Sequence, residues 1–240
     1  MRLAVNVDHF ATLREARRAG EPEPVLIALL AEQAGAEGIV CHLRSDRRHI
    51  KERDLRLLRQ TIKTKLNLEM AATADMLKVA LEVKPDVVSL VPERPAELTT
   101  EGGLNVVAGR RGLAAFIPKL LKAGIRVSIF IDPDKSQILA ASELGVPLVE
   151  INTGPYAELK PGRRRDKALE EVRRAAEFGL DRGLEEVHAG HGLDYVNVAP
   201  VLDIPHISEL SIGFSIVARS ATVGVGRAVR EMVRLLRRRR

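Results

Sequence analysis

Short apolar runs recur along the whole 240-residue chain, and most of them lack the polar alternation of a half-exposed strand. Continuous apolar runs of this kind are typical of parallel strands that are covered on both faces. Stretches of helical period separate the runs, such as PVLIALLAEQAG and ADMLKVALEV. We therefore expect eight strands, at residues 3–8, 38–43, 65–69, 87–90, 127–131, 148–151, 185–189 and 209–213.

Eight strands that alternate with helices predict an α/β protein with a single (β/α)8 TIM barrel over residues 1–240 and a few short extra helices. The alternative is an open doubly wound sheet, which needs a glycine fingerprint after the first strand. The sequence NVDHFATLR at that position contains no glycine. Segments 46–53 and 92–112 are long and polar, so we expect loops or small extra helices there, and the second segment is long enough to predict a lid.

Composition argues against several other classes of protein. The chain has no run of about 20 apolar residues, which a membrane-spanning helix requires. The N-terminal sequence MRLAVNVDH carries charge too early for a secretory signal. The single cysteine, Cys41, cannot form an internal disulfide and lies in the apolar run GIVCHL. We expect a cytoplasmic protein in which Cys41 is buried and inert.

The chain is basic, with a net charge of +6, and arginine-rich runs occur at 162–165 and 237–240. A basic surface can bind nucleic acid, and strongly salt-dependent duplex binding would favour that function. However, aromatic residues make up only 3% of the chain and tryptophan is absent, so few side chains can stack on bases. We interpret the C-terminal arginines as a solvated helix end.

Polar and ionisable residues follow the predicted strands where each strand ends. In a barrel these ends meet at one mouth, where catalytic groups lie. Burying several histidines and glutamates together is costly unless they are paired, which indicates a functional role for the group, although any one of them can be structural. For Asp132 and Asn152 we expect only a turn or a helix cap. The residues concerned are Asn6, Asp8, His9, His42, Arg44, His49, Glu69, Glu93, Thr99, Asp132, Glu150, Asn152, Thr153 and His191.

Two loops are candidates for phosphate binding. Glycine-containing segments follow the seventh and eighth strands, at 189–193 and 212–220. Barrels often hold a phosphate there, on backbone N–H groups and a helix N-terminus. Arginines near the mouth are candidates to bind a second anion, although some of them will be plain surface residues: Arg14, Arg17, Arg44, Arg47 and Arg48.

Several strings resemble one family across nearly the whole chain. VNVDHFATLREAR, CHLRSDRRHI, LNLEMA, VSLVPERPAELTTEGGL, VSIFIDPD, EINTGPYA and AGHGLDY occur in the order seen in the pyridoxine 5'-phosphate synthase family, transferases that close the vitamin B6 ring. The resemblance implies the substrates 1-deoxy-D-xylulose 5-phosphate and 3-amino-2-oxopropyl phosphate, and the products pyridoxine 5'-phosphate, phosphate and water. It also implies no metal or other cofactor, and a homo-octamer built from dimers.

The resemblance also implies residue roles, which suit a reaction that moves protons without redox change. Four acid–base groups are implied: the proton acceptors His42 and Glu69, the proton donor His191, and the transition-state stabiliser Glu150. The positions matching the deoxyxylulose phosphate contacts are Asp8, His9, Arg44, His49 and Thr99. The positions matching the aminoketone phosphate contacts are Asn6, Arg17, Gly192, Gly213 and Phe214.

The chain departs from the family pattern at two places. The family has Gly-His after the eighth strand, and this chain has Gly213-Phe214; it also has EINTG in place of EIHTG. If the phosphate binds to backbone N–H groups and to a helix that begins near Ser215, the change at Phe214 is tolerated.

A metal-dependent barrel hydrolase is the remaining alternative, with Asp8, His9, His42 and His191 as ligands. Such sites often contain His-x-His on one strand, and the first strand offers a single histidine. Stoichiometric zinc in the purified protein would favour this alternative.

Overall fold

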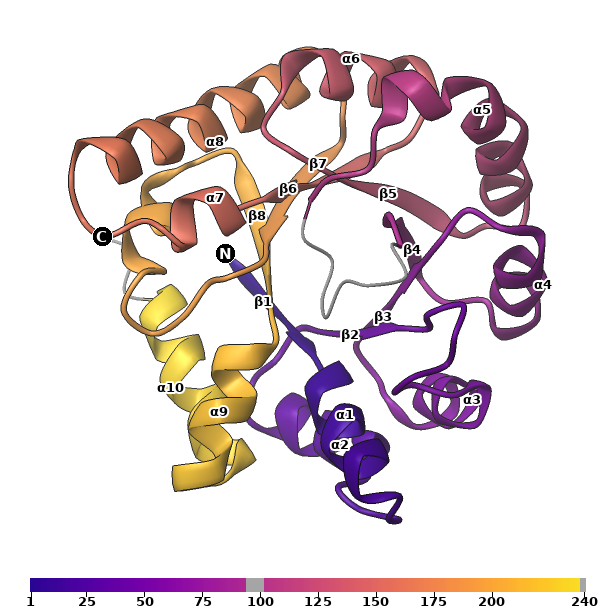
Figure 1. The fold of residues 1–240 in the computed structure, drawn as a ribbon, viewed down its shortest axis with the longest axis vertical. Helices are drawn as coiled ribbons and strands as arrows, with labels where there is room; N and C mark the ends of the chain where they lie inside the picture. Colours follow the sequence, from indigo (N-terminus) through magenta and orange to yellow (C-terminus); the bar gives the residue numbers. More distant parts are fainter. Residues whose placement is uncertain (94–101, 238–240) are drawn as a thin grey trace.

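The eight predicted strands form a closed parallel barrel in which each strand pairs with its neighbours in sequence and β1 pairs with β8 (Figure 1). This is a computed structural model, and it describes residues 1–93 and 102–237. The (β/α)8 prediction is confirmed. The strands are β1 (Arg2–Asn6), β2 (Gly38–His42), β3 (Lys65–Met70), β4 (Val87–Leu90), β5 (Arg126–Ile131), β6 (Leu148–Asn152), β7 (Glu186–Gly190) and β8 (Ile207–Ile212).

Helices surround the barrel, and their apolar faces pack on the outer side of the strands (Figure 1). The α-helices are α1 (Asp8–Arg17), α2 (Pro24–Gln33), α3 (Glu52–Thr61), α4 (Ala74–Val83), α5 (Val106–Lys122), α6 (Lys135–Glu143), α7 (Gly154–Ala157), α8 (Arg163–Asp181), α9 (Phe214–Val223) and α10 (Val225–Arg237). A 3-10 helix, η1 (Ala199–Asp203), lies between β7 and β8. No helix among the described residues is long and apolar enough to span a membrane.

The first strand is shorter than predicted, and the reason is local. The Asn6 side-chain oxygen accepts a hydrogen bond from the Asp8 backbone N–H at 2.8 Å, which closes a tight turn directly after β1. Helix α1 then begins at Asp8, inside the run 3–8 that was predicted as strand. This turn places Asp8 and His9 at the start of a helix rather than at the end of a strand.

Segments 46–53 and 92–112, expected to be loops or small extra helices, both contain the start of a helix, and so does segment 212–220, which was expected to be a loop. Helix α3 already begins at Glu52. Helix α5 begins at Val106, inside segment 92–112, because the Asn105 side chain caps the Ala108 N–H at 3.0 Å. Helix α9 begins at Phe214, inside the predicted loop 212–220 and one residue before the expected start near Ser215. The predicted lid falls partly on residues 94–101, which lie outside the described residues.

The interior of the barrel is polar, whereas aliphatic side chains fill the layer between strands and helices. Leu66 and Leu68 of β3 belong to the buried hydrophobic cluster. Their neighbours Asn67 and Lys65 point into the barrel, where Asn67 accepts a hydrogen bond from Ser89 at 2.9 Å. Side chains alternate between the two faces of a strand, so β3 supplies a polar series inside the barrel. This series ends at Glu69, at the mouth.

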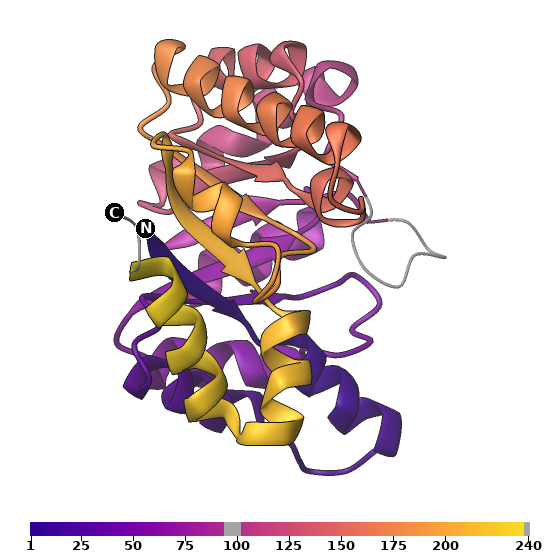
Figure 2. The same cartoon turned by 90° about the vertical axis from the view of Figure 1, so that its left-hand side faces the viewer.

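All strands point the same way, so their carboxyl ends form one mouth. Figure 2 shows β1 in indigo and β8 in orange running side by side in the same direction. Asn6, His42, Asn152 and Gly190 are the last residues of their strands and therefore lie at this mouth.

Candidate active site

Three of the predicted acid–base and binding groups converge at the mouth. Side-chain nitrogen or oxygen atoms of Asp8, His42 and Glu69 lie within 4.8 Å of one another. They come from α1, β2 and β3, which are separate in sequence and adjacent in the barrel. The mouth therefore concentrates one imidazole and two carboxyl groups at a single point.

Asp8 is held in a fixed orientation. Its carboxylate accepts one hydrogen bond from the His42 backbone N–H and one from the Asn6 side-chain amide, each at 2.8 Å. Asp8 is almost fully buried. These bonds join the end of β1 to the end of β2, so the polar groups of both strands are positioned as one unit.

His42 pairs with a carboxylate that was noted at the rim but not included among the predicted site residues. Its Nε2 lies 3.0 Å from Glu93 Oε1, and the other Glu93 oxygen accepts the Ser45 backbone N–H at 3.0 Å. Burial opposes ionisation of Glu93, but these hydrogen bonds lower its pKa to about 2. An ionised Glu93 can only accept a hydrogen bond, so the His42 ring donates to it from Nε2–H. In that tautomer the free lone pair of the imidazole is on Nδ1.

The signal that points to Glu93 is positional. It follows β4 by three residues, at the same edge of the barrel as His42. The sequence places Glu93 at the rim, but only the geometry of the barrel brings it next to His42 of β2, two strands away from β4.

His49 has a defined tautomer as well. Its Nδ1 accepts a hydrogen bond from the Ile50 backbone N–H at 2.8 Å, so the neutral ring carries its proton on Nε2. Burial lowers the pKa of His49, which keeps the ring neutral. The ring packs edge-on to that of His42, with the centroids 6.1 Å apart. His49 thus offers an N–H donor beside the predicted proton acceptor.

Arg14 anchors the His49 loop and is not available for an anion. Its guanidinium forms two hydrogen bonds with Asp54, at 2.8 and 2.6 Å, and one with the His49 backbone carbonyl at 3.1 Å. The suggestion that Arg14 binds a second anion is therefore wrong. The bidentate pair fastens α1 to α3 below the mouth.

The other arginines near the mouth differ in their surroundings. Arg44 is buried, whereas Arg47 and Arg48 are engaged with surface carboxylates: Arg47 with Glu52 and Asp75, and Arg48 with Asp46. Arg17 is exposed in the last turn of α1. Arg17 is nine positions after Asp8 in the same helix, a rise of about 14 Å, so α1 does not bring Arg17 to the convergent group.

Glu69 and Glu150 both favour the protonated state. Burial, reinforced by the charges of Glu150 and Asp8, raises the pKa of Glu69 well above its ordinary value. Burial and the charge of Glu209 raise the pKa of Glu150 to about 8. A carboxyl group with a raised pKa can exchange protons near neutral pH, which is what acid–base catalysis requires.

The segment after β7 holds His191 in an uncommon conformation. Its φ of 81° is in the left-handed region, and the next residue, Gly192, has φ 74°. The Thr153 hydroxyl lies within hydrogen-bond distance of the carbonyl oxygens of both Gly190 and His191. A Cβ on Gly154 would lie 2.8 Å from the His191 ring, so the absence of a side chain there makes room for the imidazole.

Gly213 and Phe214 form the N-terminus of α9, where backbone N–H groups point away from the helix. A Cβ on Gly213 would lie 3.1 Å from Asn6 Cβ, so the strand ends of β8 and β1 approach closely there. The Phe214 side chain is 69% exposed, and its ring contacts that of His9 with the centroids 5.5 Å apart. Burial lowers the pKa of His9, as it does for His49.

Asp132 and Asn152 have structural contacts, as expected, and Asp132 lies in a turn in which its backbone carbonyl accepts the Asp134 N–H at 2.7 Å. Asp132 accepts hydrogen bonds from the Gly103 backbone N–H at 3.0 Å and from the Asn152 side-chain amide at 2.8 Å. Asp134 caps α6. The Asn152 oxygen accepts the Gly154 N–H at 2.9 Å, which is the turn that was predicted.

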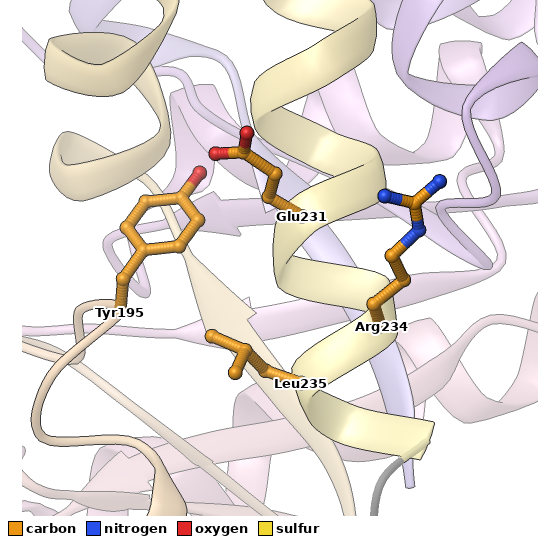
Figure 3. A pocket seen from close by; sticks show the side chains of 4 residues that line it. All are labelled: Tyr195, Glu231, Arg234 and Leu235. Carbon is orange, nitrogen blue, oxygen red and sulfur yellow. The ribbon is translucent and has the colours of Figure 1, made fainter.

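Two other features lie apart from the mouth. Cys41 is fully buried, and burial raises the pKa of its thiol, in agreement with an inert residue. A cavity of about 290 Å³ lies against α10, between Tyr195, Glu231, Arg234 and Leu235 (Figure 3). It includes none of the predicted site residues.

Thr99 is outside the residues that the structure describes.

A closed (β/α)8 barrel that gathers paired imidazole and carboxyl groups at the carboxyl ends of its strands has the arrangement of a barrel enzyme. The model of the family described as "Pyridoxal phosphate biosynthesis protein PdxJ" matches residues 3–238, and the chain belongs to this family.

Curated relatives agree with the family. A protein of Chlorobium luteolum named pyridoxine 5'-phosphate synthase is 54% identical over 98% of this chain and 100% of its own length. One of the same name from a Synechococcus species is 56% identical over 96% of both chains.

Solved structures at lower identity share the fold alone. A thiamine phosphate pyrophosphorylase of Pyrococcus furiosus aligns with a TM-score of 0.60 at 19% identity, over 98% of this chain and 95% of its own. KGPDC from Streptococcus mutans aligns with a TM-score of 0.67 at 13% identity, over 99% of this chain and 97% of its own.

Proposed function

We propose that this chain catalyses the synthesis of pyridoxine 5'-phosphate from 1-deoxy-D-xylulose 5-phosphate and 3-amino-2-oxopropyl phosphate, with release of phosphate and water. Membership of the family and identities of 54% and 56% to relatives named for this activity support the proposal. The observation on which it depends most is the convergence of Asp8, His42 and Glu69 within 4.8 Å.

The proton acceptors in this proposal are His42 and Glu69. Glu93 holds the Nε2 side of the imidazole, so Nδ1 is the atom that accepts a proton from substrate. The raised pKa of Glu69 makes its carboxylate a stronger base once it is ionised. Two bases of different strength serve a reaction in which an amine condenses with a ketone and a ring then closes.

His191 is the proposed proton donor, and Glu150 is the proposed transition-state stabiliser. Leaving water and leaving phosphate both need a proton, which an imidazole can supply near neutral pH. A protonated Glu150, whose pKa is about 8, can donate a hydrogen bond to an oxygen on which negative charge develops. Glu150 belongs to β6 and His191 directly follows β7, and these two strands lie opposite β2 and β3 in the barrel order.

We assign the two substrates to two sides of the mouth. The deoxyxylulose phosphate is held by Asp8, His9, Arg44, His49 and Thr99. The aminoketone phosphate is held by Asn6, Arg17, Gly192, Gly213 and Phe214. Arg17 lies in the last turn of α1, so it contacts this substrate only if α1 or the substrate moves.

The proposed chemistry needs no metal or other cofactor. Both oxygens of Asp8 accept hydrogen bonds from protein groups, so this side chain has a defined role without an ion. We further propose a cytoplasmic homo-oligomer, an octamer built from dimers, which exposed apolar side chains such as Leu13, Leu26 and Val196 support.

Incubation with both phosphorylated substrates tests the function. The absorbance of a new pyridine ring is expected to appear together with inorganic phosphate, and to depend on the presence of both substrates. Activity should survive treatment with a chelator. Absence of ring formation with both substrates present would overturn the proposal, whereas activity restored only by zinc would favour a metal-dependent enzyme.

Replacing Glu93 by Gln is expected to lower kcat about 10- to 100-fold, the range seen when a carboxylate that orients an imidazole is lost. A glutamine can present either N–H or C=O to His42, so the tautomer is no longer fixed. The measurement is kcat as a function of pH. Glu158→Gln, in the segment after α7, is the control and should match the wild type; an unchanged kcat in Glu93→Gln would show that the pair is only structural.

Phe214→His is expected to change the KM for the aminoketone phosphate only a few-fold, because backbone N–H groups do not depend on the side chain. Gly213→Val should raise this KM far more, since a Cβ at Gly213 approaches Asn6 within 3.1 Å and would obstruct an anion at the helix N-terminus. Steady-state kinetics of the two variants separate the possibilities. A large affinity gain in Phe214→His, with Gly213→Val silent, would show that the side chain at 214 carries the binding.

A further inference from the structure

A ladder of ionisable side chains lies inside the barrel, beneath the proposed site. Glu150 of β6 is in register with His188 of β7, and His188 is in register with Glu209 of β8. Residues in register on adjacent strands present their side chains to the same face of the sheet. All three side chains are at least 96% buried.

Cations hold Glu209 but not Glu150. Lys65 Nζ reaches across the barrel to both oxygens of Glu209, at 2.6 and 2.5 Å, and Arg2 Nε lies 3.1 Å from the same carboxylate. His188 Nδ1 lies 3.7 Å from Oε1 of Glu209. No cation of the described part of the chain forms an ion pair with Glu150.

Two buried carboxyl groups with such unequal partners ionise at different pH. The one that is paired with cations keeps its charge, and that charge disfavours a second one nearby in a medium of low dielectric constant. The pKa values agree with this difference. Burial opposes ionisation of Glu209, but His188 and Lys65 lower its pKa below the ordinary value. Burial and the charge of Glu209 raise the pKa of Glu150 to about 8.

We propose that Glu209 is a positioning residue for the reaction: its carboxylate, held ionised by Lys65 and Arg2, keeps Glu150 protonated at neutral pH, so that Glu150 faces the substrate as a hydrogen-bond donor. The inference rests on the proposed function of the mouth. It adds to that function the means by which the protonation state of Glu150 is set. Lys65 opposes Glu209 in this device, because its positive charge favours ionisation of Glu150.

The other groups near Glu150 do not replace Glu209 in this role. His188 is shared between two carboxylates, since its Nε2 also lies 3.3 Å from Glu186. Burial and like charge also raise the pKa of Glu69, so its ionisation is disfavoured for the same reasons. Phe130, the partner of Glu150 in register on β5, carries no charge.

Infrared titration of the unliganded protein tests the inference without any substrate. A protonated carboxyl group absorbs separately from a carboxylate, and Glu150→Gln identifies which part of that band belongs to Glu150. In the wild type the band is expected to persist through neutral pH and to disappear near pH 8. Glu209→Gln should move this midpoint down by at least about one pH unit, a change of about 1.4 kcal/mol in the ionisation of Glu150.

Lys65→Met provides the opposite arm. It removes the cation and leaves Glu209 paired with Arg2, so the midpoint of Glu150 should move up. The alkaline limb of the kcat–pH profile should shift in the same directions in the two variants. Glu185→Gln, an exposed carboxylate paired with Arg126 at the other end of the barrel, is the matched control and should leave the midpoint unchanged.

The outcomes are distinct. Opposite shifts in Glu209→Gln and Lys65→Met establish the device even if the chain proves to catalyse another reaction. Unchanged midpoints in both variants, or a Glu150 that is already ionised at pH 6, overturn it. If Glu209→Gln does not fold, the double variant Glu209→Gln/Lys65→Met, which removes both charges of the buried pair, is compared with Lys65→Met alone. A lower midpoint in the double variant supports the device, and an equal midpoint overturns it.

Discussion

Glu69→Gln and His191→Asn are each expected to lower kcat by at least about 100-fold, the scale of general acid–base catalysis, with little loss of thermal stability. Glutamine keeps the shape of Glu69 and removes a carboxyl group whose pKa is raised by burial. Because the pKa of Glu69 is higher in the folded than in the unfolded protein, Glu69 lowers the free energy of unfolding as the pH rises toward its folded-state pKa. The variant should therefore be as stable as the wild type in acid, and equally or more stable in alkali. Asparagine tolerates the positive φ of His191 better than most residues do.

Matched controls separate the loss of a chemical group from a general effect of substitution. Glu177→Gln changes an exposed residue of α8, and His206→Asn changes a residue that precedes β8 at the opposite end of the barrel. Both controls should keep wild-type kcat. Near-wild-type turnover in Glu69→Gln or His191→Asn would mean that the role assigned to that residue is wrong.

Gly190→Ala is expected to lower kcat by about 100-fold, although it adds a single methyl group. A Cβ on Gly190 would overlap Oε1 of Glu150, so the Glu150 carboxyl group must move. The overlap is with the end of a flexible side chain, so the barrel should still close. A displacement of about 1 Å in a catalytic group can cost about 100-fold in rate.

Gly112→Ala is the control for this substitution. Gly112 lies inside α5, and a Cβ there would have no neighbour within 4 Å, so alanine should leave kcat unchanged and favour the helix slightly. Circular dichroism and kcat would be measured on both variants. If Gly190→Ala folds and retains full activity, the observed position of Glu150 is not needed for the reaction.

Much of the site could be predicted because it depends on where strands end. Local periodicity locates eight strands, and the parallel order then places the residues that follow them at one mouth. Asp8, His42 and Glu69 were found in this way and do converge. The strand ends were predicted less well. Asn6 closes a turn that ends β1 early, and Asn105 caps the start of α5 inside a segment where a loop or a small extra helix was expected. Both boundaries depend on a single side-chain hydrogen bond.

The sequence by itself determined the barrel, the mouth and the identity of most groups that face it, since these follow from short-range patterns. Only the tertiary structure decided which groups are partners. Glu93 is hydrogen-bonded to His42, which lies 51 positions away in the sequence. Arg14 pairs with Asp54 over 40 positions, and Lys65 pairs with Glu209 over 144 positions. Such pairs depend on the register of strands and on the reach of side chains across a closed barrel, and no local pattern in the chain encodes either one.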